Sequence, residues 1–236
     1  MKQTVVIISG WAHGLEAIRP MGAALAPQFN VQLLTGSQVL RDQKIPEADY
    51  IVTGSMGGLL AMELLPARCQ KLVLLSSTAK FCAAEDYACG TSEKVLKRML
   101  RMLKRNPDAV LQDFFKNVHF PHTFASVRRE RQNTKEKGLQ SSSHTSASVQ
   151  EPLASLVTGL EYLLASDVRA TVPTLKIPVH LFHGEADRII PKSAADWLHA
   201  HLPDSRLTLF EDEGHALPAY HFTAIMDEIS SFLELH

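Results

Sequence analysis

The sequence predicts an α/β protein: a mostly parallel β-sheet with helices on both faces and one helical insertion. In residues 1–78, and again from about residue 176 to residue 236, short and nearly continuous apolar segments alternate with helical segments. That alternation is typical of parallel strands that are buried on both faces. Between these two regions the alternation stops and the sequence becomes helical. We therefore expect a core of residues 1–78 and 176–236, with an inserted helical lid at residues 79–175.

The first part of the predicted core has a regular order of elements. Strands are expected at residues 5–8, 31–34, 50–53 and 72–76, and helices at residues 15–26 and 57–65. Pro27 and Pro66 follow the two helices and would end them, because proline cannot continue a helix. Only about 20 residues separate the second strand from residue 55, and Pro46 lies among them. We therefore expect the crossover helix at this point to be shortened or missing.

The insertion is predicted to be helical, whereas the last part of the core alternates strands and helices. Between residues 96 and 103, leucine and methionine recur at spacings of three and four, which is one face of a helix. Pro107 begins a second helical segment, and residues 153–164 form a third. The core pattern then resumes, with strands at residues 179–183 and 206–210 and helices at residues 193–201 and 222–233.

The composition excludes several classes of protein. Of the 236 residues, 45% are hydrophobic and 21% are charged, as in an ordinary globular domain. Cys69, Cys82 and Cys89 are too few and too irregularly spaced for a disulfide framework, so we expect reduced thiols in a cytoplasmic protein. No apolar run approaches the roughly 18 residues that cross a bilayer. We expect no membrane segment, and the unpaired spacing of the cysteines argues against a zinc site.

The charge is distributed unevenly along the chain. Residues 94–137 contain twelve Lys or Arg and four Asp or Glu, whereas the rest of the chain has twelve basic and twenty-one acidic residues. A basic insertion therefore accompanies an acidic core, and this asymmetry needs an explanation.

Ser55 is the candidate nucleophile. It stands in Thr53-Gly54-Ser55-Met56-Gly57-Gly58, between a predicted strand and a predicted helix. A sharp turn at this point lifts a serine hydroxyl clear of the backbone, and small neighbours are needed to avoid a collision. The usual pattern is G-x-S-x-G, and Thr53 replaces its first glycine.

Asp187 and His215 are the candidate orienting acid and general base. Each lies in a loop directly after a predicted strand, and the 28 residues between them hold a single crossover. Carboxyl ends of parallel strands meet at one edge of the sheet, so the three side chains should lie together there. The chain order Ser, Asp, His is the one expected when a serine hydrolase uses such a sheet.

Each residue alone has a simpler interpretation. Ser55 could belong to an incidental glycine-rich turn, Asp187 could be an ordinary loop acid with Glu185 competing for its role, and His215 could be a surface histidine. The order and the positions of the three residues together favour the catalytic interpretation.

The chain resembles the α/β-hydrolase family over nearly its whole length. Within it, the chain is most similar to the carboxylesterases of biotin synthesis that demethylate pimeloyl-[acyl-carrier protein] methyl ester. The matching stretches are the loops of Asp187 and His215 together with Ile8-Ser9-Gly10-Trp11, Gly54-Ser55-Met56-Gly57-Gly58, Leu74-Leu75-Ser76-Ser77, Gly159-Leu160-Glu161-Tyr162-Leu163 and Asp167-Val168-Arg169. Relatives usually have histidine where this chain has Ser9.

This resemblance implies an activity and further site residues. It implies a serine carboxylesterase that cleaves a methyl or similarly small ester, without a cofactor. It also implies an oxyanion hole formed by the backbone N–H groups of Trp11 and Met56. An acyl-carrier protein is acidic, so the basic insertion would hold it through Arg98, Arg101, Arg128, Arg129 and Arg131, with Phe114 and Phe115 along an acyl channel. A solvated helix face is the alternative for these arginines, and simple lid packing is the alternative for the phenylalanines.

Other functions remain open on the same residues. The triad would equally serve a general carboxylesterase, a thioesterase or a carbon–carbon bond hydrolase. A non-catalytic relative could use the lid as a protein-binding surface. Nucleic acid is a poorer explanation of the basic segment, because no nucleic-acid-binding motif accompanies it. The sequence predicts neither the acyl length nor the oligomeric state.

Overall fold

The sheet has the parallel order that the sequence predicts. The computed structural model describes residues 2–122 and 151–234. Its six strands run in the order β2-β1-β3-β4-β5-β6, and every neighbouring pair is parallel. The strands are β1 (Thr4–Ile8), β2 (Asn30–Leu34), β3 (Tyr50–Gly54), β4 (Lys71–Leu75), β5 (Val179–Gly184) and β6 (Ser205–Phe210). The prediction of an α/β fold is confirmed.

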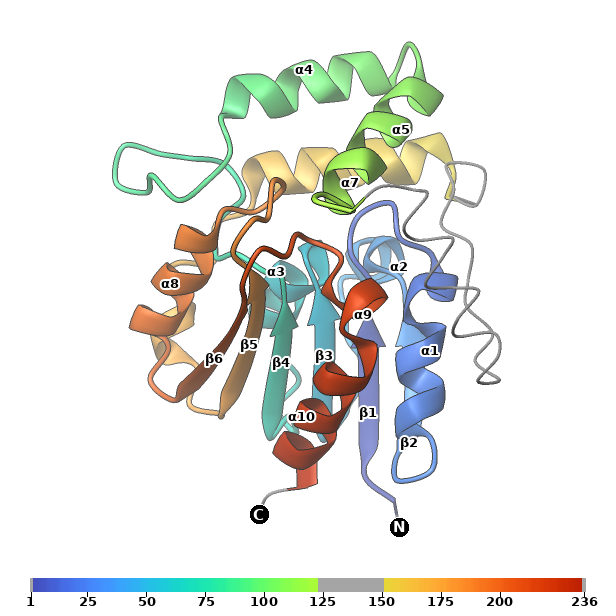
Figure 1. Ribbon diagram of the computed structural model, residues 1–236, viewed down its shortest axis with the longest axis vertical. Helices are drawn as coiled ribbons and strands as arrows, with labels where there is room; N and C mark the ends of the chain where they lie inside the picture. Colours follow the sequence, from blue (N-terminus) through green and yellow to red (C-terminus); the bar gives the residue numbers. More distant parts are fainter. Residues whose placement is uncertain (1, 123–150, 235–236) are drawn as a thin grey trace.

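Helices cover both faces of this sheet (Figure 1). Side chains of a strand alternate between faces, so in β1 Val5 and Ile7 join one core while Val6 and Ile8 join the other. The first core is closed by α1 (Leu15–Leu25), α9 (Leu217–Tyr220) and α10 (Phe222–Glu234). The second is closed by α3 (Met56–Glu63) and α8 (Lys192–His201). Because both of their faces are buried, the central strands β1, β3, β4 and β5 are largely apolar, which is the pattern that made them visible in the sequence.

The crossover between β2 and β3 holds a short helix, α2 (Gly36–Asp42). Thr35 begins it with a capping box: its hydroxyl accepts from Gln38 N at 3.1 Å, and the Gln38 side chain accepts from Thr35 N at 2.8 Å. Gln43 ends it in the left-handed region, with φ 49°. The expected helix is therefore shortened rather than missing. It packs against α3 and against α7 (Leu153–Ala165) of the insertion.

Three described helices lie between β4 and β5 in the sequence: α4 (Glu93–Leu103), α5 (Pro107–Val118) and α7 (Leu153–Ala165). Figure 1 shows them above the carboxyl ends of the strands. A short 3-10 turn, Val172–Thr174, then leads back to the sheet. In α4, Leu96 and Leu103 are buried while Val95 and Met102 are exposed. Among the described residues, no helix has the length and apolarity to span a membrane.

Candidate active site

Ser55 lies in the sharp turn between β3 and α3. Its φ of 53° and ψ of −119° are unfavourable for a residue with a side chain and cost about 1–3 kcal/mol. The surrounding backbone enforces this conformation: Ser55 N donates to Leu75 O at 2.9 Å. On Gly57, a Cβ would approach Ile8 O to 2.9 Å, and a Cβ on Gly10 would lie 3.1 Å from the Ser55 Cβ. The turn thus needs a small residue at position 57 and another at position 10, in the loop that faces the serine.

Thr53 fits this turn although glycine is usual at its position. The side chain is fully buried, and its hydroxyl donates to Val73 O on the neighbouring strand β4 at 3.2 Å. This hydrogen bond offsets the cost of removing the hydroxyl from water. The departure from the usual motif therefore leaves the geometry at Ser55 intact.

Asp187 and His215 are in direct contact, from the loops that follow β5 and β6. His215 Nδ1 lies 2.7 Å from Asp187 Oδ2, and both residues are buried. The other carboxylate oxygen, Oδ1, accepts from Ile189 N at 2.7 Å and from Ile190 N at 2.9 Å. Burial alone would raise the pKa of Asp187, but the charge of His215 and these hydrogen bonds outweigh it and hold the pKa below its ordinary value.

This contact fixes the state of the imidazole. A carboxylate can only accept hydrogen bonds, so Nδ1 of His215 carries the proton and donates. In the neutral ring Nε2 is then left with a lone pair, which is the form that a general base requires. The main chain of His215 is fixed as well, since the Ser76 hydroxyl donates to its carbonyl at 3.0 Å.

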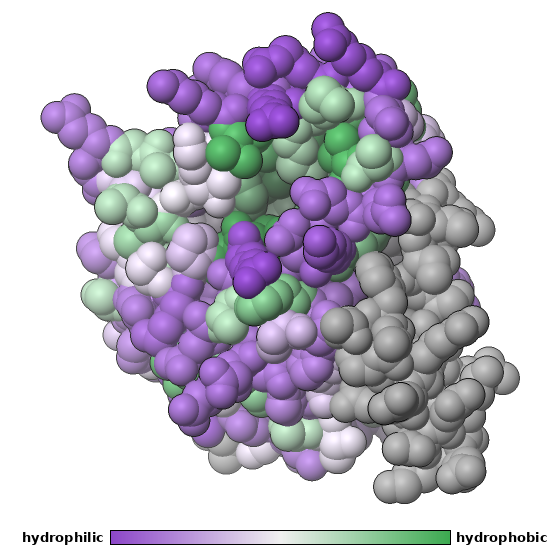
Figure 2. Space-filling model, turned by 45° about the horizontal axis from the view of Figure 1, so that its top comes forward, coloured by the Kyte–Doolittle hydropathy of each residue, from purple (hydrophilic) through white to green (hydrophobic). Residues whose placement is uncertain are grey.

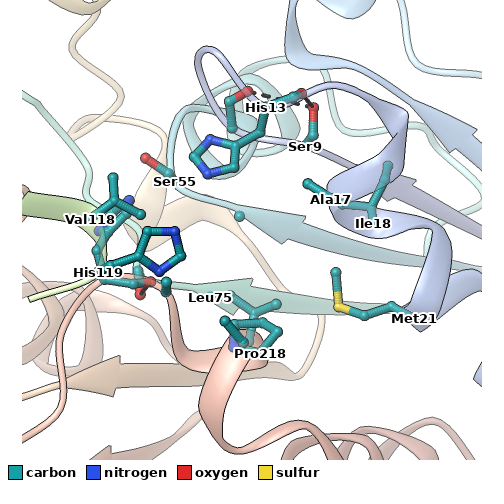
Figure 3. A pocket seen from close by; sticks show the side chains of 16 residues that line it. Ser9, His13, Ala17, Ile18, Met21, Ser55, Leu75, Val118, His119 and Pro218 are labelled. Carbon is teal, nitrogen blue, oxygen red and sulfur yellow. Dashed lines mark hydrogen bonds between the residues drawn. The ribbon is translucent and has the colours of Figure 1, made fainter. Parts of the chain in front are cut away.

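Ser55 and His215 line the same cavity, of about 110 Å³. Figure 3 shows Ser55 beside His13 and His119, with Ala17, Ile18 and Met21 of α1 and Pro218 of α9 along the wall. The Ser55 hydroxyl forms no hydrogen bond with a described residue, His215 included. Such bonds are often long before substrate binds and tighten in the reacting complex. The arrangement therefore places a serine and an oriented histidine on the wall of one cavity.

Trp11 follows Gly10, whose Cα faces Ser55, and Met56 directly follows Ser55 in the chain. Met56 is the first residue of α3, so its N–H has no partner within the helix. The N–H of Trp11 donates to no described residue. The indole of Trp11 is held by the insertion: Nε1 donates to Leu156 O at 2.8 Å, and Phe114 packs edge-on at 4.8 Å.

His13 is a cavity residue that the sequence analysis missed. A single histidine in a loop forms no pattern with other residues, so no sequence signal indicated it. Nδ1 lies 2.8 Å from Trp11 O and donates to it, and the ring packs against Phe115 at 5.4 Å. Burial lowers the pKa of His13 to about 4, against a smaller opposing effect of the Trp11 hydrogen bond and with a further contribution from His215. The ring is therefore neutral at physiological pH.

We expect His13 to make the protein less stable in acid. Its pKa is about 4 in the folded chain and 6.5 in the unfolded chain, so between these values the unfolded state binds more protons. The free energy of unfolding should fall as the pH drops through this window, by up to roughly 1.4 kcal/mol per pH unit. His13→Asn keeps an N–H for Trp11 O but does not titrate, and should flatten this dependence in urea unfolding between pH 6.5 and 4.5. Replacing exposed His201 by asparagine is the control, and equal slopes in all three proteins would contradict the prediction.

The remaining predicted contact residues lie on the insertion. Arg98 and Arg101 are exposed on α4, away from the cavity. Phe115 is buried and Phe114 is half-buried; both pack near Trp11 and His13, and neither lines the cavity with Ser55. Arg128, Arg129 and Arg131 lie outside the described residues.

The sheet order, the strained serine between β3 and α3 and the Asp–His pair at the carboxyl edge define an enzyme of the α/β-hydrolase class. The model of the family described as "Serine aminopeptidase, S33" matches residues 31–219. The chain belongs to this hydrolase family, and the resemblance noted in the sequence is confirmed.

Curated relatives and solved structures agree with this assignment. The "Pimeloyl-[acyl-carrier protein] methyl ester esterase" of Nitrosomonas europaea is 31% identical over 233 residues, which are 90% of this chain and 88% of the relative. The protein of the same name from Aromatoleum aromaticum is 31% identical over 186 residues, 74% of this chain and 71% of the relative. An esterase from Exiguobacterium antarcticum superposes with a TM-score of 0.80 at 17% identity, covering 99% of this chain and 92% of its own. Together these findings support an ester-hydrolysing enzyme.

Proposed function

We propose that this chain is a serine carboxylesterase in which Ser55 is the nucleophile, His215 the general base and Asp187 the residue that orients the base. The observation that carries the proposal is the 2.7 Å contact between His215 and Asp187 on the cavity that Ser55 also lines. The contact fixes the tautomer, and the strained turn at Ser55 presents its hydroxyl to the same space.

The reaction follows from these positions. Nε2 of His215 takes the proton of the Ser55 hydroxyl as the oxygen attacks the ester carbonyl. Asp187 stabilises the imidazolium that forms. The bond from the carbonyl carbon to the alkoxide then breaks, and the imidazolium gives its proton to this leaving group, which departs as an alcohol while the acyl group remains on Ser55 as an acyl-serine. A water molecule deprotonated by His215 attacks the acyl group and releases the acid, with Ser55 restored.

The oxyanion of each tetrahedral intermediate requires hydrogen-bond donors. The N–H groups of Trp11 and Met56 are suited to this role because both lie next to Ser55. Neither donates a hydrogen bond to another described residue, so both can donate to the oxyanion. Met56 also places the positive end of the α3 dipole beside the developing charge. Losing one such donor lowers turnover by roughly 10²–10³ in serine hydrolases.

The proposed substrate is a methyl or similarly small ester of an acyl chain, with pimeloyl-[acyl-carrier protein] methyl ester as the particular candidate. Two observations support it: the names of the curated relatives and the cavity itself. At about 110 Å³ the cavity is smaller than the roughly 150 Å³ that holds benzene. None of the described residues lining it is Asp, Glu, Lys or Arg, so it suits a short, uncharged group such as the alcohol arm of the ester.

We propose that the insertion, within residues 79–175, is a lid over the core and the docking surface for the acidic carrier. The exposed face of α4 carries Lys94, Arg98 and Arg101 beside exposed Val95 and Met102, and exposed Arg105 follows the end of the helix. Figure 2 views the molecule from this side and shows a hollow with apolar residues in its depth and a largely hydrophilic rim. A positive surface beside the active site would increase the rate of encounter with an acidic protein.

Charge reversal on α4 tests the docking surface. In the double variant Arg98→Glu/Arg101→Glu, we expect kcat/KM for the carrier-linked methyl ester to fall about tenfold at low salt, because steering is lost. The difference should shrink at high salt, where charges are screened. Hydrolysis of free p-nitrophenyl acetate should be unchanged.

The matched control is Lys44→Glu/Lys176→Glu, which makes the same charge change at exposed residues near the amino ends of the strands. An equal loss of kcat/KM in the control and in the α4 variant would contradict the docking proposal. A wild-type enzyme that hydrolyses p-nitrophenyl esters but not the carrier-linked methyl ester would instead indicate a general esterase.

A further inference from the structure

We propose that Glu213 and His122 are positioning residues that tie the end of helix α5 to the loop of His215. The proposal rests on the proposed role of His215 as general base. It gives a role to residues 118–122, which end the first described part of the insertion. These residues belong neither to the proposed triad nor to the proposed oxyanion hole.

Glu213 lies between two histidines from different parts of the chain and is bonded to one of them. His122 Nε2 donates to Glu213 Oε2 at 2.8 Å, from the segment just after α5. His221 Nε2 lies 2.8 Å from Oε1, from the residue between α9 and α10. The His122 ring stacks on Tyr220 at 3.7 Å. Only 14% of the Glu213 side chain is exposed, so this carboxylate is largely withdrawn from water.

Backbone contacts join the same two segments. Ala216, the residue after His215, donates its N–H to Val118 O at 3.1 Å. The Cα of Gly214, the residue before His215, faces Phe120 O so closely that a Cβ at this position would overlap that oxygen. His215 is therefore bracketed on both sides by contacts with residues 118–120. No side chain separates the two backbones at Gly214.

The loop of Asp187 is part of the same assembly. Ala186 N donates to Glu213 O at 2.8 Å. The Arg188 guanidinium carbon lies 3.2 Å from the centre of the Phe120 ring. The end of α5 thus contacts both loops whose side chains form the His215–Asp187 pair.

These contacts matter because the His215 loop has no regular structure of its own. It connects β6 to α9 through residues 211–216, and Asp212 in it has a φ of 59°. General-base catalysis needs the imidazole within about 0.5 Å of its working position, and a displacement of 1 Å can cost roughly 10² in rate. Removing the Glu213–His122 bond should loosen the loop and lower kcat. KM should change little, because neither side chain lines the cavity.

The test compares Glu213→Ala, His122→Ala, the double variant and Glu213→Gln, with p-nitrophenyl acetate as substrate. Each rate is divided by the fraction of active sites that a fluorophosphonate titrates, which gives kcat per intact site. We expect kcat per site to fall about tenfold in each alanine variant, with KM within about twofold. The double variant should be no slower than the slower single variant, because both changes remove one interaction. Glu213→Gln should recover most of the rate, since its amide oxygen still accepts from His122.

Glu211→Ala, at an exposed acid in the same loop, is the control and should match wild type. The positioning role is overturned if kcat per site is unchanged in Glu213→Ala, if fewer sites titrate but each keeps its normal rate, or if the two single effects add. Wild type and Ser55→Ala are assayed first. If wild-type activity does not depend on Ser55, the proposed triad fails, which is a result distinct from failure of the positioning role.

Discussion

Replacement of Ser55 by alanine is expected to lower the turnover number on p-nitrophenyl acetate by on the order of 10⁶. The variant removes the only atom proposed to form the acyl-enzyme, while Trp11, Met56 and the His215–Asp187 pair remain. Alanine has the same Cβ as serine, so the unusual backbone conformation of φ 53° imposes no additional cost. The fold should therefore be retained, as measured by circular dichroism and urea unfolding.

Two measurements make this result specific. A fluorophosphonate probe should label wild type and not Ser55→Ala. Ser193→Ala, at an exposed serine on α8, is the matched control and should keep both labelling and activity. Continued labelling of Ser55→Ala, or activity within tenfold of wild type, would show that another residue carries the reaction. Folded wild type without any labelling would favour a non-catalytic binding protein.

Replacement of Asp187 by asparagine is expected to lower the turnover number by about 10⁴, the loss seen when a triad aspartate is replaced in this way. The hydrogen bonds around the carboxylate give the reason. Ile189 N and Ile190 N both donate to Oδ1, so the asparagine must keep its oxygen there. Its NH₂ group would then face Nδ1 of His215 and donate to it. This forces the proton of the imidazole onto Nε2, where it prevents His215 from accepting the Ser55 proton.

The control for this variant is Glu185→Gln, which changes an exposed acid two residues earlier in the same loop. It should match wild type in kcat and KM. Loss of activity in Glu185→Gln together with normal activity in Asp187→Asn would transfer the orienting role to Glu185. Urea unfolding of Asp187→Asn separates a catalytic loss from a loss of fold.

Local patterns in the sequence predicted those parts of the fold that depend on burial and chain order. Strands β1, β3, β4 and β5 are buried on both faces, so their apolar runs stand out directly. The positions of Ser55, Asp187 and His215 follow from one topological fact: the loops after parallel strands emerge at the same edge. The sequence did not decide whether the helix at α2 is shortened or missing, because it has only seven residues. The capping pair Thr35 and Gln38 was a usable signal for its start.

Other parts of the site depend on contacts between residues far apart in the chain. His13 is neutral because of burial beneath the insertion, and Glu213 is held by His122, which lies 91 residues away in the sequence. Neither arrangement has a local period or motif. The sequence also could not show how Thr53 is accommodated, since its hydroxyl bonds to the neighbouring strand β4.

The close approach of Gly214 to Phe120 has a consequence for engineering. A chimera could replace the whole insertion, from the end of β4 to the start of β5, by that of another hydrolase. This replacement would remove the Val118 carbonyl and the Phe120 backbone, which contact the loop of His215. Chimeras should instead retain residues 118–122 and exchange only the sequence beyond them. In that sense the boundary between the interchangeable and the fixed parts of this enzyme falls within the insertion, not at its ends.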